Sequence, residues 1–306
     1  MIQKQTQKMK KPYLYHKLVG LSALFFLLLQ SAFAAEAILL NVTGDVEVSV
    51  SGKTQKAKSG QGIEVGASVI SRGGIATILF ADGKTKELIA DKTVKIEPQN
   101  RPDRSSPAPF FSRLVTSIAE MTATDKEVTV KGMVRSSKED QRFHLLGPCN
   151  TFIQREKLEF RWGQTAEGIG KSSILIKSRN PKFKYSFLVD GTNQRAALPA
   201  NAPPLEPMVR YYWKITPLAE ADNEIVLAEL CWFSILSDPE EAKLKKELAA
   251  VESLSSLQQE EKDFLTAHLY GSYRLFSEAI GLAKKYPDRS SMNTLLKQLE
   301  RRQQLD

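Results

Sequence analysis

The sequence predicts a multidomain, mainly β protein with a C-terminal α-helical module. Two stretches, at about residues 36–98 and 141–237, consist of short segments in which apolar and polar residues alternate, with turn residues between them. This alternation is typical of β-strands. Over residues 238–306, apolar residues instead recur three or four positions apart, which indicates amphipathic helices. A leucine-rich run near the N-terminus fits neither pattern.

That run belongs to a segment with the three parts of a secretory signal peptide. Residues 1–17 contain five lysines and no acidic residue, and an apolar segment follows from Leu18 to Leu29. The sequence Ala32-Phe33-Ala34 then places small residues at the two positions that signal peptidase reads. We therefore predict that residues 1–34 are a signal peptide, cleaved between Ala34 and Ala35. A lipoprotein signal would require cysteine where Ala35 stands.

An uncleaved membrane anchor is the alternative interpretation of the same segment. Leu18 to Ala35 is a stretch of 18 uncharged residues, at the lower limit for a membrane-spanning helix. Cleavage predicts a periplasmic protein without a stable membrane span, whereas an anchor predicts an inner-membrane protein that faces the periplasm. No other segment is comparably apolar, so in both cases we expect the rest of the chain to lie on one side of the membrane.

The composition is that of an ordinary globular chain. Hydrophobic residues make up 42% and charged residues 25% of the 306 positions, which excludes a mostly disordered protein. The chain has 43 basic and 35 acidic residues, a net charge of +8 that by itself would suggest a nucleic-acid ligand. Removal of the five signal-peptide lysines leaves 38 basic and 35 acidic residues, a net charge of +3. We therefore expect no nucleic-acid partner.

Cys149 and Cys231 are the two cysteines of the chain, too few for a disulfide-dense scaffold or a cysteine-rich zinc module. Because exported proteins fold in an oxidising compartment, the pair is a candidate disulfide bond. The alternative is two reduced, buried cysteines.

The first β stretch, residues 36–98, contains Asp82-Gly83 between two strand-like segments. This pair is a strong hairpin signal, because glycine accepts the positive φ of the turn. A series of short motifs runs through the stretch: Gly44-Asp45-Val46-Glu47-Val48, Gly60-Gln61-Gly62-Ile63, Gly66-Ala67-Ser68-Val69, Ser71-Arg72-Gly73-Gly74-Ile75-Ala76, Phe80-Ala81-Asp82-Gly83 and Lys92-Thr93-Val94-Lys95-Ile96. The order of these motifs resembles the FecR-type domain.

One motif departs from the family, which usually has threonine and a small residue where this chain has Ser71-Arg72. The change is conservative and leaves the resemblance in place. FecR itself is a membrane regulator whose cytoplasmic part holds a sigma factor and whose periplasmic part meets an outer-membrane transporter. Here 17 residues precede the apolar segment, too few for a cytoplasmic anti-sigma domain. The resemblance therefore implies a periplasmic setting without sigma-factor regulation, and it assigns no catalytic residue.

Residues 99–140 predict a linker that contains a short helix. Residues 99–107 have the proline-rich, polar composition of an exposed connector. A set of apolar residues then recurs at helical spacing, which predicts a short amphipathic helix that packs back on a domain. These residues are Phe110, Phe111, Leu114, Val115 and Ile118.

The second β stretch, residues 141–237, predicts a two-sheet sandwich of about seven short strands. Its aromatic segments resemble fibronectin type III-like modules of exported bacterial proteins, which implies an Ig/fibronectin-like β-sandwich. The aromatic residues suggest either core packing or carbohydrate binding, and their strict alternation favours the core. Cys149 and Cys231 fall near the first and last strands, which are often neighbours in such sandwiches. The aromatic segments are Phe160-Arg161-Trp162, Tyr212-Trp213-Lys214-Ile215 and Trp232-Phe233-Ser234-Ile235.

Four helices are predicted over residues 238–306. The first begins at Asp238-Pro239, with Asp238 as the capping residue and acidic residues in the first turn. Small Ala279 at the helix crossing and Pro287 after the second helix of the pair resemble one tetratricopeptide-type helix pair. Such repeats normally stack in threes, so a plain α-hairpin packed on the sandwich remains an equal alternative.

No catalytic constellation emerges from the motifs. Gly168-Ile169-Gly170-Lys171-Ser172 resembles the end of a phosphate-binding loop, but Thr165 stands where that motif requires glycine. A strand-like segment follows, so we predict a hairpin loop. After cleavage the histidines are His144 and His268, separated by a domain, which supports neither a histidine metal site nor a Ser-His-Asp triad. We therefore expect no enzyme, no cofactor and no metal.

These features together predict a non-catalytic exported bacterial protein that acts as a periplasmic binding or scaffolding component of a cell-envelope assembly. The expected partner is an envelope or periplasmic protein. Two alternatives remain open: a membrane-anchored, FecR-like signal-transduction regulator, and a module that binds envelope carbohydrate such as peptidoglycan.

Overall fold

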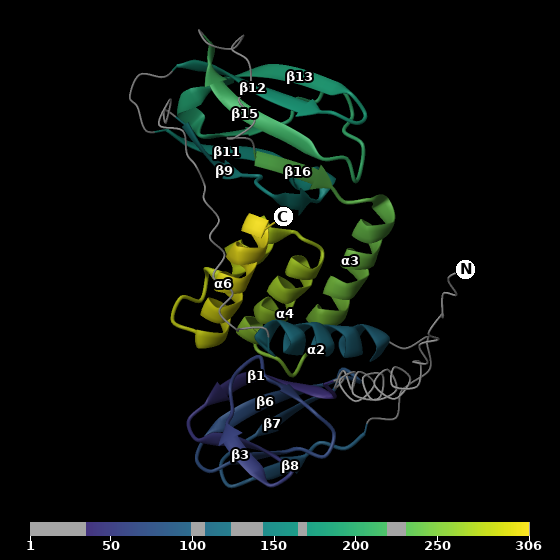
Figure 1. Ribbon diagram of the computed structural model, residues 1–306, viewed down its shortest axis with the longest axis vertical. Helices are drawn as coiled ribbons and strands as arrows, with labels where there is room; N and C mark the ends of the chain where they lie inside the picture. The colour runs from purple at the N-terminus through teal and green to yellow at the C-terminus, as the bar shows by residue number, and fades with distance from the viewer. Residues whose placement is uncertain (1–34, 99–107, 124–142, 165–169, 219–230, 306) are drawn as a thin grey trace, which may run out of the picture. The chain divides into compact units, whose positions relative to one another are not determined.

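The computed structural model describes residues 35–98, 108–123, 143–164, 170–218 and 231–305 (Figure 1). They belong to one compact unit, built mostly of antiparallel sheets with helices at the C-terminal end. This confirms the predicted fold class in its coarse form, mainly β with a C-terminal helical region. The predicted signal peptide, including Ala34, lies outside the described residues.

The N-terminal β region (residues 35–98) consists of two four-stranded sheets, in the orders β4-β1-β6-β7 and β3-β2-β5-β8, with all pairs antiparallel. A core cluster made of side chains from both sheets lies between them. Gly83 has φ of +86° in the turn between β6 and β7, as the Asp-Gly hairpin signal predicts. The strands are β1 Ala37–Thr43, β2 Val46–Val50, β3 Lys53–Lys56, β4 Gly62–Ile63, β5 Ser68–Ser71, β6 Ile75–Phe80, β7 Thr85–Leu88 and β8 Thr93–Lys95.

Strand β1 is buried on both of its faces. Ala37 and Leu39 point into the core between the two sheets, whereas Ile38 and Leu40 belong to a second cluster formed with the helices. All four side chains are at most 3% exposed. The uninterrupted apolar run at these positions follows from this arrangement, because a strand covered on both sides has no solvent-facing positions to fill with polar residues.

Helix α2 (Ala108–Ala123) covers the outer face of the sheet that contains β1. Phe111, Leu114 and Val115 are buried in the cluster that this sheet shares with the helical region. The helix packs closely against the turn between β6 and β7 at Gly83. A Cβ atom on this residue would lie 2.6 Å from the ring of Phe111. The short amphipathic helix predicted from residues 110–118 is confirmed. Residues 99–107 and 124–142 of the predicted linker lie outside the described residues.

The β-sandwich-like region (residues 143–236) has a five-stranded sheet in the order β10-β16-β15-β12-β13 and a three-stranded sheet in the order β14-β11-β9. Strand β10 pairs with β16 in parallel, and the other pairs are antiparallel. The strands are β9 Phe143–Gly147, β10 Thr151–Ile153, β11 Glu159–Gln164, β12 Lys171–Ser178, β13 Phe183–Asp190, β14 Arg195–Ala197, β15 Tyr211–Pro217 and β16 Cys231–Ile235, with 3-10 turns η1 Arg155–Lys157 and η2 Gly191–Asn193.

Aromatic residues dominate the core of this region. Phe160, Trp213 and Phe233 lie fully buried, with ring centroids 5.0 to 5.7 Å apart in the two contacts of Phe160. Two of the buried tryptophans also have hydrogen-bonded indole groups: Nε1 of Trp162 donates to the carbonyl of Gly191 at 3.0 Å, and Nε1 of Trp213 donates to that of Pro148 at 2.7 Å. All three tryptophans are at most 5% exposed, which agrees with the core-packing interpretation of the aromatic segments.

The helical region (residues 237–305) contains the four predicted helices, α3 Asp238–Glu252, α4 Gln259–Ser272, α5 Phe276–Ala283 and α6 Ser290–Leu305. Each helix packs against the next in sequence, and α4 also contacts α6. Ala267, Ala279 and Ala283 are buried at the helix contacts, and Gly271 lets α4 approach Leu299 of α6. Among the described helices, none is both long enough and apolar enough to cross a membrane.

The prediction that Asp238 caps α3 is wrong by one residue. Ser237 is the capping residue, and Asp238 is already in the helix. The side chain of Glu240 returns to Ser237, accepting from its hydroxyl at 2.8 Å and from its backbone N–H at 3.3 Å. A serine followed three positions later by glutamate is a capping box, so this cap is visible in the sequence once Ser237 is compared with Asp238.

Candidate binding cleft

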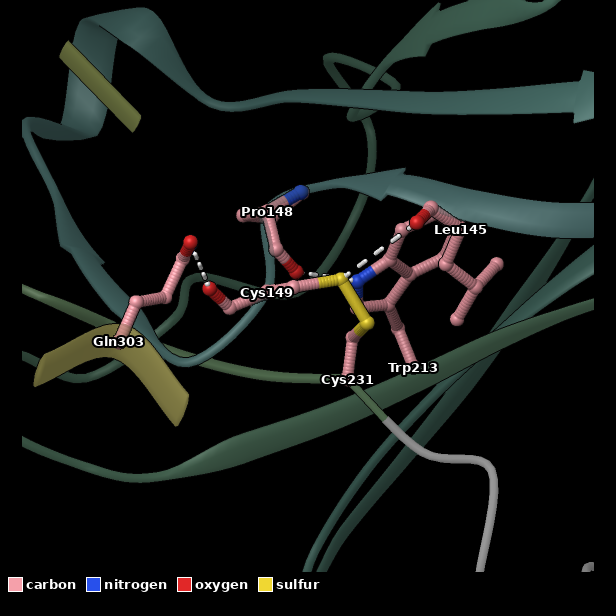
Figure 2. The surroundings of a disulfide bond; sticks show 6 residues. All are labelled: Leu145, Pro148, Cys149, Trp213, Cys231 and Gln303. Atoms are coloured by element: carbon pink, nitrogen blue, oxygen red, sulfur yellow. Dashed lines mark hydrogen bonds between the residues drawn. A yellow bond between two sulfur atoms is a disulfide. The ribbon is translucent and has the colours of Figure 1, made fainter. Parts of the chain in front are cut away.

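The predicted pair Cys149 and Cys231 forms a disulfide bond in the β-sandwich-like region (Figure 2). Cys149 precedes β10 and Cys231 begins β16, the strand that pairs with β10, so the two Cα atoms lie 4.5 Å apart. The carbonyl of Cys149 accepts a hydrogen bond of 2.7 Å from the side-chain amide of Gln303 on α6. The disulfide-bonded end of this region therefore also contacts the helical region.

A second contact between these two regions centres on the hydroxyl group of Thr151. This buried oxygen accepts a hydrogen bond of 2.9 Å from the backbone N–H of Phe276, at the start of α5. Its own hydrogen is within reach of the carbonyl of Arg274, at 3.1 Å. The backbone N–H of Phe152 donates to the same carbonyl at 2.9 Å. Strand β10 thus binds the turn between α4 and α5 through a small network of hydrogen bonds.

A cleft of about 480 Å³ lies where α2, the β-sandwich-like region and the helical region meet, a size typical of ligand sites. Its apolar lining is continuous with a small cluster that contains buried Leu236 and Leu269. Phe110 and Phe152, which are partly buried, extend this apolar surface toward solvent. The cleft is therefore built from three stretches that are far apart in the sequence.

The acidic groups that line the cleft are already bound by groups of the protein. Glu247, whose side chain is 9% exposed, accepts a hydrogen bond of 2.8 Å from Arg113 and one of 2.9 Å from the hydroxyl of Tyr273. Glu240 is held in the capping box with Ser237. Burial raises the pKa of Tyr273, and its hydrogen bond to Glu247 raises it further. Tyr273 therefore stays protonated and serves as a hydrogen-bond donor to Glu247.

Cationic groups lie on aromatic rings around the same cleft. The Lys243 ammonium is 5.9 Å from the centre of the Tyr273 ring. The guanidinium of Arg274 lies 5.4 Å from the ring centre of Phe152 and 5.9 Å from that of Trp232. Such contacts attract a cation to the negative face of the ring without neutralising its charge. The rim of the cleft is therefore electropositive above an apolar floor.

Two residues of the rim have backbone conformations that side chains rarely adopt. Met208 has φ of +62° and Arg274 has φ of +61°, in the left-handed region that costs non-glycine residues of the order of 1 kcal/mol. The Met208 side chain is also 53% exposed. Strained, non-glycine residues are found more often at functional sites than elsewhere.

A smaller cavity of about 240 Å³ lies between the β-sandwich-like region and α5. Lys157, Arg161 and Glu278 line it, and Oε2 of Glu278 is buried without a hydrogen-bond partner among the described residues. Burial raises the pKa of Glu278, against opposing effects of its backbone hydrogen bond and of the two cations.

Where the structure describes them, the other residues singled out in the sequence lie apart from one another. His144 lies on β9 and His268 is buried in α4, and the described residues contain no group of three or more side chains placed to hold a metal ion. Lys171 and Ser172 belong to β12, whereas residues 165–169 of the glycine-containing loop lie outside the described residues. Ala35 at the predicted cleavage position is 6% exposed and packs in the cluster around α2.

Comparisons with known proteins leave the family open. No protein-family model and no curated protein matches the chain. Among solved structures, one described as "Cell surface anchoring domain" is similar at 31% sequence identity, covering 21% of this chain and 86% of the other, with a TM-score of 0.20.

The sequence patterns did not predict the cleft. Its lining comes from α2, β10, the segment before β15, α3 and α4, and no motif spans these elements. Asp238-Pro239-Glu240 and the alternation in the sandwich predict the elements that line the cleft, but not the contact between these elements.

Proposed function

We propose that this protein is a non-catalytic, exported bacterial protein that binds a protein partner within a cell-envelope assembly in the periplasm. In this proposal residues 36–98 are a FecR-type domain, residues 141–237 a fibronectin type III-like sandwich, and residues 238–306 a tetratricopeptide-like helical module. The observation that carries the proposal is the cleft, in which the helical region, α2 and the β-sandwich-like region expose apolar side chains beneath an electropositive rim.

Three further features support the proposal. The signal-like segment before Ala35 favours export, and a disulfide bond fits an oxidising compartment. The helical region contacts both β regions through buried side chains, for example Leu265 toward the N-terminal β region and Leu275 toward the β-sandwich-like region. Such contacts link both β regions to the helical region, which suits a scaffold.

Affinity purification tests this function directly. The full chain, tagged at its C-terminus, would be expressed in the bacterium that encodes it, and the envelope fraction would be cross-linked and purified. We expect a protein partner to copurify with wild-type chain and to be depleted with a cleft variant, Phe152→Ala with Met208→Gly, relative to an off-cleft variant such as Lys246→Gln. If no protein is enriched over an untagged control, the proposed function is wrong.

Two measurements separate the alternatives. N-terminal sequencing of the exported protein should give a chain that begins at Ala35; an intact N-terminal segment would instead support the membrane-anchored regulator. Binding to purified peptidoglycan at low salt should be absent, because the tryptophans that could stack on sugars are buried. Retention on peptidoglycan would favour the carbohydrate-binding alternative.

A further inference from the structure

We propose that the cleft binds an extended segment of the partner in which an acidic side chain stands next to large apolar side chains. This inference rests on the proposed function and specifies the chemistry of the partner. It follows from which groups of the cleft are already engaged by the protein and which remain for a ligand.

The ionic group of the cleft that remains available is the ammonium of Lys243. The carboxylates of Glu240 and Glu247 are engaged by Ser237, Arg113 and Tyr273. Lys243 is exposed, contacts the face of Tyr273, and forms no ion pair among the described residues. A ligand that enters the cleft therefore meets an ammonium group whose charge is not neutralised, and this favours a carboxylate over a neutral or cationic group.

The floor of the cleft requires apolar contacts from the same ligand. Leu236 and Leu269 are at most 3% exposed, and Phe110 and Phe152 extend the apolar surface outward. A ligand with charge alone would leave this surface in water. A peptide that carries leucine or phenylalanine beside aspartate or glutamate would cover the floor and reach the rim together, because neighbouring side chains of an extended chain point to opposite faces and alternate ones to the same face.

Met208 gives the inference a test that separates binding from folding. Its side chain is exposed on the rim, and its backbone N–H donates to the carbonyl of Ile235 at 2.8 Å. Met208→Gly keeps that hydrogen bond, removes the flexible thioether and relieves the positive φ. If the Met208 side chain contributes to stability, Met208→Gly should be less stable than the wild-type protein. If the side chain instead contacts the ligand, the variant should be more stable and should bind the ligand more weakly.

The experiment uses three pools of acetylated, amidated heptapeptides and the exported full-length protein. The first pool draws each position from Asp, Glu, Leu, Phe and Gly; the second replaces the acids with Asn and Gln; the third replaces Leu and Phe with Ala. We expect retention of the first pool to exceed that of either other pool about tenfold at low salt, and to fall steeply at 0.5 M NaCl. Similar retention of the three pools, or no retention, would overturn the inference.

Matched variants place the binding in the cleft. Lys243→Gln should lower retention of the acidic pool about fivefold, the range for a rim charge, whereas Lys246→Gln on the same helix should leave it unchanged. Met208→Gly should lower retention and raise the melting temperature. The control is Gln194→Gly, at another residue with positive φ of +57° outside the cleft, which should raise the melting temperature alone. If either control variant lost as much peptide retention as its cleft variant, the assignment of binding to the cleft would be wrong.

The two proposals fail in different ways. If a protein partner copurifies from the envelope fraction but neither the pools nor the cleft variants show an acidic, apolar preference, the partner binds elsewhere and the proposed function stands. If no partner copurifies, the function itself is wrong, whatever the peptides do.

Discussion

The two β regions are joined to the helical region in different ways. The N-terminal β region shares one continuous apolar cluster with α2 and the helices, to which its own strands contribute Ile38, Leu40 and Leu79. The β-sandwich-like region keeps its large core to itself. It contacts the helices through hydrogen bonds of Thr151 and Cys149 and through a small cluster that contains Leu236.

The difference predicts unequal resistance to separation. Opening the first contact exposes buried apolar side chains to water, at a cost that grows by about 25 cal/mol for each Å² of apolar surface. Opening the second contact breaks a few hydrogen bonds, each of which contributes only about 1 kcal/mol net, and exposes only the small apolar cluster that contains Leu236. The cleft lies along this second contact, where a partner segment can bind with little reorganisation of the rest of the chain.

The largest expected effect comes from the disulfide bond. Replacing Cys149 and Cys231 together with alanine removes a bond that spans 82 residues, for which the chain-entropy estimate is about 4 kcal/mol. Because both cysteines lie in the β-sandwich-like region, its unfolding transition should move to lower denaturant, and that of the N-terminal β region should not. Chemical denaturation followed by tryptophan fluorescence reports on the β-sandwich-like region, since all three tryptophans lie there.

The control for this prediction is dithiothreitol. Reduction of the wild-type protein should reproduce the shift of the double variant, and reduction of the double variant should change nothing. A single, coincident transition that shifts as a whole would contradict the independence of the two contacts.

Phe111→Ala should have the next largest effect, and it acts on the other contact. This ring is 3% exposed and lies against Gly83 of the β6–β7 turn, and truncation of a buried phenylalanine costs about 3–5 kcal/mol. Phe110→Ala is the matched control, because the neighbouring ring is only partly buried, and we expect about half the loss. Both are measured as changes in the free energy of unfolding. Equal losses of unfolding free energy in the two variants would mean that the burial of Phe111 by α2 does not stabilise the N-terminal β region.

The sequence predicts the elements of both contacts better than the contacts themselves. Periodicity predicts α2, the clearly alternating strands such as β11 and β15, and all four C-terminal helices, because each depends on neighbours within a few residues. The two-sided burial of β1 has a visible signal, the apolar run from Ala37 to Leu40 without alternation, although the run does not say what covers the second face. The signal-like segment and the expected proximity of the first and last strands of a sandwich were enough to predict the disulfide bond.

The cleft could not be predicted, for a physical reason. Phe110, Phe152 and Lys243 come from three separate elements, and only their packing brings them together. Met208 and Arg274 have positive φ values, but neither residue is the glycine or asparagine that usually marks such positions in a sequence. Sites built from long-range contacts between ordinary residues leave no local pattern.

Acid should lower the stability of the helical region, and we expect one histidine, His268, to contribute to this effect. His268 is 3% exposed and contacts Phe264, and burial lowers its pKa from 6.5 to about 3, with Arg302 adding to the effect. The folded chain keeps His268 neutral while the unfolded chain binds a proton below pH 6.5. The free energy of unfolding therefore keeps its full value above pH 6.5 and decreases as the pH falls toward 3. At pH 5 the decrease is about 2 kcal/mol.

Comparison with His268→Leu isolates this contribution, because carboxylates elsewhere titrate in both proteins. The difference in unfolding free energy between pH 7.5 and pH 5 should be about 2 kcal/mol larger in the wild-type protein. The signal to follow is the helical one, circular dichroism at 222 nm. Parallel pH profiles for the two proteins would contradict the prediction, because they would show that folding does not lower the pKa of His268.

Thr151→Val is expected to have the smallest effect and the most local one. The substitution keeps the shape of the side chain but removes the hydroxyl that accepts from the N–H of Phe276, leaving that donor without its partner at a cost of about 1–2 kcal/mol. Thr151→Ser, which retains the hydroxyl, should lose less. Amide hydrogen exchange is the sharpest measurement, because the turn at Arg274 and the first residues of α5 should exchange faster while the amides of β1 and α2 keep wild-type rates. Faster exchange throughout β1 would show that the hydrogen-bonded contact also supports the apolar one, and that the two β regions are not held independently.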